Sequence, residues 1–280
     1  MRLLVATAFF VVFNIQFSQA VSLPKASLPK FTGALNFAEE GNFEGTVALS
    51  NCSGSIIRFD QSDENDLALM MTNGHCIRLM GADEVVIDQK VTRSMTVLDA
   101  KAKNLGRLRT ARVVYATMKK TDLAIYELEK TYKEIRDRFN VEPLTLSASP
   151  ARIGDEIRVI SGYWKASLFC KADDFVFRLK EADWTFEDSL RYSPECKVYG
   201  GTSGSPVVLE GTRTVIAVNN TGNEDGKECL LNNPCEVTKD QQVSVRKGIG
   251  YGQQVYWIYS CLNENRKLDL SIQGCLLPKP

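Results

Sequence analysis

The chain has 280 residues, of which 44% are hydrophobic and 24% are charged. This composition is typical of a globular protein, and the length suffices for one large domain or two small ones around a substantial core. Lys plus Arg and Asp plus Glu each total 34, so the formal net charge is zero. A balanced charge argues against nucleic acid and against stable membrane association as modes of binding. We interpret the basic residues between Lys90 and Lys120 as solvated strand faces and loops.

Residues 1–20 have the pattern of a secretory signal peptide. Arg2 supplies a positive charge, Leu3 to Phe13 form an apolar run, and Ser18-Gln-Ala20 is a small-residue cleavage site. The apolar run is too short to span a membrane, and no later segment reaches about 18 uncharged apolar residues. We therefore expect an exported protein that is extracellular or periplasmic.

Residues 21–42 read as an N-terminal extension or a short pro-segment. The sequence Ser-Leu-Pro-Lys occurs twice between Val21 and Lys30. Proline prevents a regular helix or a central strand there, so we expect no packed element in this stretch.

From Gly45 onward, short runs of apolar and β-branched residues alternate with groups of Gly, Asn, Asp and Ser. We predict strands at Gly45–Leu49, Ser55–Phe59, Leu67–Thr72, Glu84–Ile87, Arg112–Ala116, Leu123–Leu128, Glu156–Ser161, Phe175–Leu179, Ser205–Leu209 and Thr214–Val218. The regular spacing of such short strands predicts an all-β barrel or sandwich.

Two segments are predicted to be helical. Glu129–Asn140 is rich in charge and free of Gly and Pro, and its central position suggests a link between two halves. Gln253–Tyr259 is the second candidate, with aromatic side chains that could pack on a barrel. The expected architecture is therefore two β halves of similar length plus a C-terminal helix.

The chain contains eight cysteines, which we expect to form disulfides because export places them in an oxidising compartment. A metal site is disfavoured, since there is no Cys-x-x-Cys pair and only one histidine. Nearest-neighbour pairing gives Cys52–Cys76, Cys170–Cys196, Cys229–Cys235 and Cys261–Cys275. A Cys196–Cys229 bridge, with Cys170 and Cys235 re-paired, stays open as an alternative.

A nucleophilic hydrolase needs an activated hydroxyl or thiol, a base that accepts its proton and a carboxylate that orients the base. His75 is the only histidine in the chain, so no other histidine can serve as this base. It follows an apolar strand and precedes Cys76, whose disulfide would fix the loop. Asp122 stands directly before an apolar strand, where its carboxylate can be buried against a partner.

Ser203 lies in the glycine-rich sequence Gly200-Gly-Thr-Ser-Gly-Ser-Pro206. Glycine permits backbone conformations that are closed to other residues, so a serine in such a turn can be exposed while backbone N–H groups converge on one point. That convergence is the requirement for an oxyanion hole, and the N–H groups of Gly201 and Ser203 are the natural donors. Ser203 is the candidate nucleophile, and a plain glycine–serine turn is the alternative.

Three short motifs resemble those of the chymotrypsin-like (trypsin-like) serine peptidases. Thr72-Asn-Gly-His-Cys76 matches the histidine box of that family, Thr121-Asp-Leu-Ala124 its aspartate box, and Gly201-Thr-Ser-Gly-Ser-Pro206 its serine box. The motifs occur in the family's order, and the resemblance extends from about Gly41 to Leu262. The serine box looks most like that of bacterial secreted, glutamyl-endopeptidase-like members.

The resemblance implies two six-stranded antiparallel β-barrels with an inter-barrel helix and a C-terminal helix. The peptidase domain would cover residues 43–280, with barrels at about 43–128 and 141–262, a linking helix at 129–140 and a disulfide-tied tail at 263–280. Ser203 would attack a peptide carbonyl, His75 would transfer the proton, and Asp122 would orient the imidazole. Polypeptides are the implied substrates of a monomeric enzyme that requires no metal and no organic cofactor.

Thr202 departs from the pattern of the digestive members of the family. Those members carry an aspartate at this position, which pairs with a newly cut N-terminus. A threonine cannot form that ion pair, so we do not expect activation by this route.

The resemblance also places a specificity pocket around the nucleophile. Its residues would be Lys197, Tyr199, Asn219, Asn220 and Thr221. A lysine in the pocket floor would favour an acidic substrate side chain, and the alternative is that Lys197 points to solvent.

Two other functions stay open on the sequence alone. A chymotrypsin-like domain can serve as a catalytically silent binding protein, although all three triad members are present here. An esterase or deacylase could use the same triad. An α/β-hydrolase, however, would need Gly-x-Ser-x-Gly and a histidine after the nucleophile, whereas Ser205 occupies the last position and His75 comes first.

Overall fold

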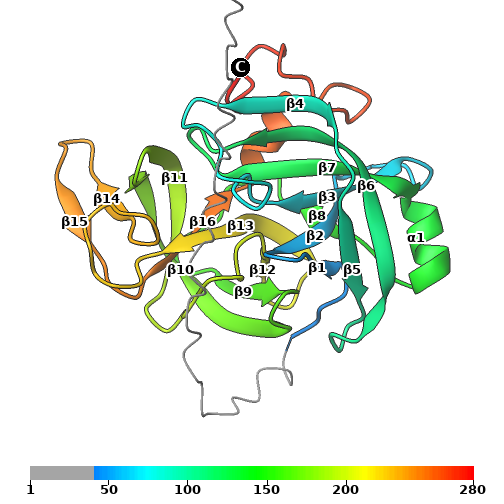
Figure 1. The fold of residues 1–280 in the computed structure, drawn as a ribbon, viewed down its shortest axis with the longest axis horizontal. Coiled ribbons are helices and arrows are strands. Elements are labelled where there is room, and N and C mark those ends of the chain that lie inside the picture. The colour runs from blue at the N-terminus through cyan, green and yellow to red at the C-terminus, as the bar shows by residue number, and fades with distance from the viewer. Residues whose placement is uncertain (1–40) are drawn as a thin grey trace, which may run out of the picture. The chain divides into compact units, whose positions relative to one another are not determined.

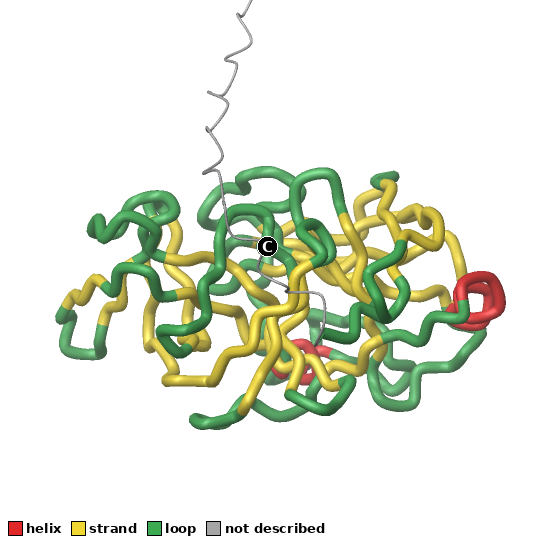
Figure 2. Tube along the Cα trace, turned by 90° about the horizontal axis from the view of Figure 1, so that it is seen from below, coloured by secondary structure: helices red, strands yellow, loops and turns green. Residues whose placement is uncertain are grey.

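Short apolar and β-branched segments form sixteen strands within residues 41–280, the part of the chain that this computed structural model describes (Figure 1). The expected signal peptide and nearly all of the expected N-terminal extension lie outside the described residues. Within residues 41–280 the chain has little helix, and Figure 2 shows strands joined by loops almost throughout. The regular spacing of short strands is thus realised as an all-β structure.

The first barrel lies at the right in Figure 1 and is closed. Its strands are β1 (Thr46–Ala48), β2 (Ser53–Arg58), β3 (Leu67–Thr72), β5 (Ser94–Leu98), β6 (Asn104–Thr117) and β7 (Leu123–Thr131). Their order around the barrel is β1-β5-β6-β7-β3-β2, and β2 pairs back with β1. All six pairings are antiparallel. The additional strand β4 (Val85–Lys90) pairs with β6.

The second barrel is built in the same way. Its strands are β9 (Glu156–Ser161), β10 (Ala166–Glu181), β11 (Trp184–Tyr192), β12 (Pro206–Leu209), β13 (Thr214–Gly222) and β16 (Gly250–Gln254). Their order is β13-β12-β9-β10-β11-β16, and an antiparallel pairing of β16 with β13 closes the ring. A hairpin of β14 (Cys235–Val237) and β15 (Val243–Val245) extends from β10.

One strand and a shared apolar core join the two barrels. The strand β8 (Leu144–Leu146) pairs in parallel with β2 of the first barrel and with β13 of the second. Each barrel also has its own interior, represented by Tyr126 in the first and Tyr192 in the second, while Phe43 and Ile258 belong to the core between them. All four side chains are completely buried. The loops at the barrel junction are therefore supported by a well-packed apolar core.

The helix between the barrels, α1 (Tyr132–Phe139), is shorter than the Glu129–Asn140 segment predicted from the sequence. The residues up to Thr131 continue β7 instead. Thr131 caps the helix by accepting the N–H of Glu134, whose carboxylate accepts the N–H of Thr131 in return. Asn140 ends the helix with a φ of 52°, a left-handed conformation that asparagine adopts more readily than most residues.

The C-terminal helix is a single 3₁₀ segment at Tyr256–Cys261, and the predicted helix at Gln253–Tyr259 begins too early. Gln253 belongs to β16 because it pairs with Val218 and so helps to close the second barrel. With this shift in the helix boundaries, the expected fold class is confirmed: two six-stranded antiparallel barrels with an inter-barrel helix and a short C-terminal helix.

Four disulfides are present within the described residues. They join Cys52 to Cys76, Cys170 to Cys196, Cys229 to Cys235 and Cys261 to Cys275. Each bridge joins nearest neighbours in sequence, so the alternative Cys196–Cys229 bridge does not form. The first bridge ties β2 to the loop after β3, and the second ties β10 to the segment that leads to Ser203.

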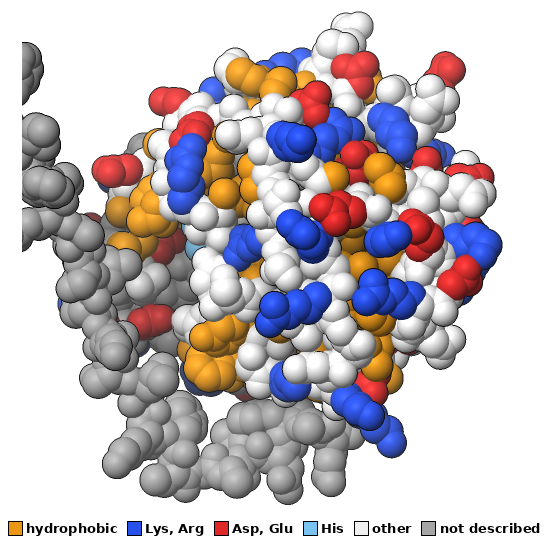
Figure 3. Space-filling view, turned by 45° about the vertical axis from the view of Figure 1, so that its right-hand side comes forward, with side chains coloured by type: hydrophobic (Ala, Val, Ile, Leu, Met, Phe, Trp, Pro, Cys, Tyr) orange, Lys and Arg blue, Asp and Glu red, His pale blue; other side chains and the backbone are white. Residues whose placement is uncertain are grey.

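Charged side chains are mixed on the surface rather than segregated by sign. Figure 3 shows Lys and Arg interspersed with Asp and Glu on the face that carries the first barrel. In the basic stretch of this barrel, Arg112 pairs with both Asp88 and Glu127. No helix among residues 41–280 is long and apolar enough to cross a lipid bilayer.

Candidate active site

Side chains from three separate loops meet at one cavity where the barrels adjoin. His75 follows β3 and Asp122 precedes β7, so both belong to the first barrel, whereas Ser203 precedes β12 of the second. All three residues line a cavity of about 190 Å³. The structure therefore brings together the residues of the three sequence motifs.

Asp122 holds the imidazole of His75 through two hydrogen bonds. Its Oδ2 lies 2.6 Å from Nδ1 of His75, and its Oδ1 accepts the backbone N–H of His75 at 3.1 Å. The carboxylate is 1% exposed, so water competes little for it. Because a carboxylate only accepts hydrogen bonds, Nδ1 carries the proton in the neutral ring, and Nε2 is left as the basic nitrogen.

The pKa of His75 is raised above its usual value. Removal of the ring from water lowers this pKa, but the charge and the hydrogen bond of Asp122 raise it by more, and the charge of Glu181 adds to the rise. Glu181 lines the same cavity, and burial raises the pKa of its carboxyl group. The imidazole is therefore a stronger base than an unperturbed histidine.

Two glycines allow the loops of the site to approach closely. A Cβ atom on Gly74 would lie 2.3 Å from the carbonyl oxygen of Thr117. A Cβ atom on Gly204, whose φ is +77°, would lie 2.1 Å from Oγ1 of Thr72 and 2.2 Å from the carbonyl oxygen of Ser53. At both positions any larger residue would force the loops apart, and at Gly204 it would also meet an unfavourable backbone conformation.

The hydroxyl of Ser203 donates to the carbonyl oxygen of Asn220 at 3.2 Å. Within residues 41–280 it forms no hydrogen bond with His75. Serine has one side-chain torsion with three staggered minima, so the hydroxyl can change partner without any movement of the backbone. Hydrogen bonds between catalytic groups are often long or misaligned before substrate binds.

Two backbone N–H groups beside this hydroxyl, those of Gly201 and Ser203, have no acceptor in the described part of the chain. Gly201 has a φ of 91°, which is open to glycine. The indole N–H of Trp164 donates to the carbonyl oxygen of Gly200 at 2.8 Å. Since C=O and N–H point in opposite directions across a trans peptide, this bond turns the N–H of Gly201 away from the indole.

Thr202 holds the nucleophile turn together through uncharged groups. It is 2% exposed, and its hydroxyl donates to the carbonyl oxygen of Tyr199 at 2.6 Å. The amide of Asn219 donates to the carbonyl and hydroxyl oxygens of Thr202, at 2.9 and 3.1 Å. The turn thus contains no buried charge that a newly cut N-terminus would have to neutralise.

Hydrogen bonds from the first barrel position the nucleophile turn of the second. Asn73 is completely buried, and its side chain donates to the carbonyl oxygen of Asp122 at 2.8 Å and accepts the N–H of Gly204 at 2.6 Å. The backbone N–H of Ser53 donates to the carbonyl oxygen of Ser203 at 2.8 Å. These bonds fix the backbone of Ser203 relative to Asp122, although the two residues belong to different barrels.

Four of the residues expected to form the specificity pocket line the cavity: Tyr199, Asn219, Asn220 and Thr221. Lys197 lies outside this lining. Its side chain is exposed, and its ammonium group donates to the carbonyl oxygen of Gly248 at 3.4 Å. The acidic preference inferred from a lysine in the pocket floor therefore has no basis in the structure.

Val198 limits the depth of the cavity at the end lined by Gly222. A Cβ atom on Gly250 would lie 2.4 Å from Cγ2 of Val198, and one on Gly222 would lie 3.2 Å from the same atom. The valine side chain thus occupies the space that these two glycines leave open. Val198 and Gly222 line the cavity, whereas Gly250 does not.

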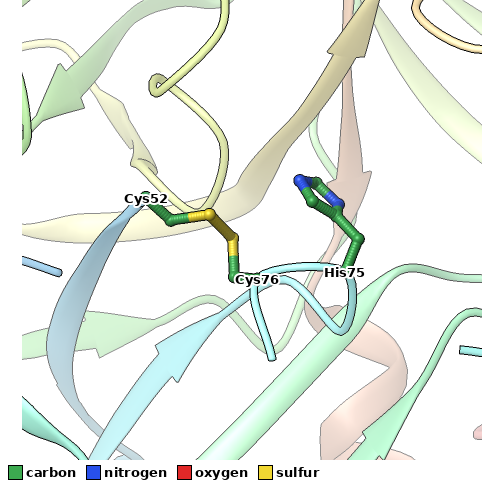
Figure 4. A group of neighbouring side chains, drawn as sticks. All are labelled: Cys52, His75 and Cys76. Atoms are coloured by element: carbon green, nitrogen blue, oxygen red, sulfur yellow. A yellow bond between two sulfur atoms is a disulfide. The ribbon is translucent and has the colours of Figure 1, made fainter. Parts of the chain in front are cut away.

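His75 lies beside the Cys52–Cys76 disulfide, as Figure 4 shows. Ligand atoms of these three residues lie within 4.8 Å of one another, a spacing that would suit a metal ion. Cysteine binds metals as the thiolate, however, and here the two sulfur atoms are bonded to each other. The arrangement fixes the histidine loop and offers no thiolate ligand.

Several residues that shape this site were not predicted from the sequence. Asn73 lies inside the histidine motif, where a polar residue at the end of an apolar strand is a signal that could have been used. Trp164 lies in a turn and Glu181 at the end of a strand. No local sequence pattern around either residue indicates that it lies near the residues of the three motifs. Both acquire their roles only through pairing of distant strands.

Comparison with known proteins gives one family assignment. The model of the trypsin-like peptidase domain matches residues 52–218, which is more than half of the chain. No curated protein matches.

Several solved protease structures are similar to the chain at low identity. The protease domain of MamO from Magnetospirillum magneticum is 14% identical, with coverage of 79% of this chain and 97% of the MamO chain and a TM-score of 0.48. The active form of the Rv3671c protease from M. tuberculosis is 14% identical, with coverage of 85% of each chain and a TM-score of 0.43. The HtrA-type protease AlgW with a decapeptide is 18% identical, with coverage of 73% and 48% and a TM-score of 0.44.

Proposed function

The chain belongs to the trypsin-like peptidase family, and we propose that it is an exported serine endopeptidase with His75, Asp122 and Ser203 as its catalytic triad. The observation that carries this proposal is the pairing of a buried carboxylate with the only histidine, in a cavity that also contains Ser203. A structural histidine would not need a buried aspartate on Nδ1 in the same cavity as a serine from a glycine-rich turn.

In the proposed mechanism, a substrate carbonyl displaces the resting contact between Ser203 and Asn220, and the hydroxyl turns to Nε2 of His75. The oxygen of Ser203 attacks the carbonyl carbon while His75 takes its proton. The C–N bond then breaks as His75 returns that proton to the leaving amine. Water repeats the sequence on the resulting acyl-enzyme and releases the acid. Asp122 stays ionised throughout and stabilises the imidazolium.

The N–H groups of Gly201 and Ser203 would bind the oxygen that becomes negatively charged during the attack. Support comes from their lack of acceptors among the described residues and from the bond between Trp164 and Gly200, which fixes the intervening peptide. Fixed donors stabilise a developing charge without reorganising during the reaction.

Export is part of the proposal because four disulfides require an oxidising compartment to form and persist. The extracellular medium and a bacterial periplasm both satisfy this requirement. Residues 1–20, which have the pattern of a signal peptide, would direct the export. The proposed substrates are polypeptides that the protein meets after export.

The nucleophile can be tested without knowing the substrate, by treating disulfide-bonded protein with a fluorophosphonate probe and mapping the labelled peptide. We expect labelling at Ser203, and its loss in both Ser203→Ala and His75→Ala. Ser205→Ala is the matched control, because the Ser205 hydroxyl is buried and has no hydrogen-bond partner in residues 41–280. If correctly folded protein stays unlabelled, the enzyme proposal fails and a catalytically silent binding protein replaces it.

A further inference from the structure

The cavity contains a second carboxylate, Glu181, that the triad does not use. Glu181 ends β10 and is 6% exposed. Its Oε1 accepts the backbone N–H of Asn232 at 2.7 Å. The carboxylate is therefore held in a defined position on the wall shared with His75.

No Lys or Arg among the described residues forms an ion pair with Glu181. Burial raises the pKa of its carboxyl group, and the charge of Asp122 raises it further. A buried carboxylate is unfavourable unless it is paired with a charge or fully hydrogen-bonded. The cavity thus has an acidic group whose counter-charge the protein does not supply, although a cation entering from solvent could supply it.

Apolar side chains form the walls around this carboxylate. They are Leu79, Met118, Trp184 and Phe186. The indole N–H of Trp184 donates to the carbonyl oxygen of Met80 at 2.9 Å, so the ring is fixed in place. Lys and Arg carry a charged head on an apolar stem, and a wall of this composition with an acid on it matches such a side chain.

Two parts of the cavity differ in the side chain that they accept. The end at Val198 is filled by that side chain, whereas the part beside His75 has the buried Glu181 among apolar side chains. Glu224 also lines the cavity, but it is exposed to solvent. Successive side chains of an extended peptide point to opposite sides. Consecutive substrate residues can therefore occupy the two parts, with the residue that supplies the scissile carbonyl at the Val198 end.

We propose that Glu181 selects a Lys or Arg side chain in the substrate residue that directly precedes the one supplying the scissile carbonyl. The latter residue is small. This inference rests on the proposed peptidase function, and it assigns the substrate preference to an acid in the second barrel and not to Lys197.

The test compares two peptide substrates that differ at one position. Both have Ala before the cleaved bond, and the preceding residue is either Lys or norleucine, which keeps the apolar stem and lacks the charge. We expect kcat/KM for the Lys peptide to exceed that for the norleucine peptide by about tenfold or more, the usual scale of a charge-assisted contact.

Two variants locate the origin of this preference. Glu181→Gln keeps the shape and an acceptor oxygen, and we expect it to abolish the preference, so that the ratio of kcat/KM for the Lys peptide to that for the norleucine peptide falls to about 1. Asp183→Asn is the matched control, because Asp183 is an exposed acid in the same β10–β11 turn and does not line the cavity. It should keep the full preference.

Binding of the same peptides to the Ser203→Ala protein separates this inference from the proposed function. Tighter binding of the Lys peptide, lost on adding Glu181→Gln, supports the cation site whether or not the protein is an active peptidase. Equal binding of both peptides, or a preference that survives Glu181→Gln, overturns it. Absence of fluorophosphonate labelling overturns only the peptidase function.

Discussion

At the scale of single residues, His75 lies in the field of two carboxylates. Asp122 is bonded directly to the ring, and Glu181 acts through the cavity. Both favour the protonated imidazole, whereas general-base catalysis requires the neutral form. In the proposed mechanism His75 is therefore a stronger base, and we expect the activity to fall at low pH, where the imidazole is protonated.

This field predicts the pH dependence of hydrolysis. The pKa of His75 lies above 6.5, so kcat/KM for an uncharged peptide should rise with pH through an apparent pKa above that value. Glu181→Gln removes one contribution that raises the pKa, so the rise should move to lower pH. A pH profile with the norleucine peptide measures both. An unchanged or upward-shifted midpoint in Glu181→Gln would contradict the account.

Trp164 is a positioning residue, since its indole holds the carbonyl of Gly200 and so orients the N–H of Gly201. Trp164→Phe keeps an aromatic ring and removes the donor. We expect kcat to fall by about tenfold with KM nearly unchanged, which is less than the loss of an oxyanion donor itself. The kcat and KM of a peptide substrate give this result.

Tyr163→Phe is the control for that experiment, because Tyr163 is the neighbouring exposed aromatic residue and also loses one polar group. It should leave both constants unchanged. A rise in KM of Trp164→Phe without a fall in kcat would mean that the indole binds substrate and does not orient the peptide.

At the scale of elements, the site depends on the junction between the end of β3 and the turn before β12. Asn73 spans that junction with one bond to each side, to Asp122 and to Gly204. The bonds are buried, so the groups left behind by a truncation would lie in a poorly hydrated environment.

Asn73→Ala is therefore expected to lower the free energy of unfolding by about 1–3 kcal/mol and to slow fluorophosphonate labelling at Ser203. Urea denaturation and labelling rates measure the two effects. Asn65→Ala is the control, because Asn65 is exposed and bonds only within its own turn; a change below about 0.5 kcal/mol is expected there. Equal effects in the two variants would refute the role of Asn73.

At the scale of the whole molecule, the fold and the meeting of His75, Asp122 and Ser203 at one cavity could be predicted because their signals are local. The three motifs are short, and strand spacing is visible in runs of a few residues. The predicted helix boundaries were less accurate, because Gln253 can be assigned to a strand only when its partner Val218 is known. Each boundary error comes from a long-range pairing that a local pattern does not contain.

The substrate-facing residues were harder to predict for the same reason. The family resemblance placed Lys197 in the pocket floor, with a solvent-facing side chain as the alternative. The structure has the alternative, because the chain between Cys196 and Gly200 turns the Lys197 side chain to solvent and places Val198 against the cavity. Glu181 reaches His75 only through the β10–β11 hairpin of the other barrel. Side-chain direction in an irregular segment is set by tertiary packing, which a sequence pattern does not specify.

The most direct test of the central claim is digestion of an unfolded polypeptide by the export-processed protein, with the products identified by mass spectrometry. We expect cleavage at internal peptide bonds by the wild-type protein and none by Ser203→Ala. An intact polypeptide after incubation with protein that the fluorophosphonate probe labels at Ser203 would contradict it, because the serine would then be reactive without the protein being an endopeptidase.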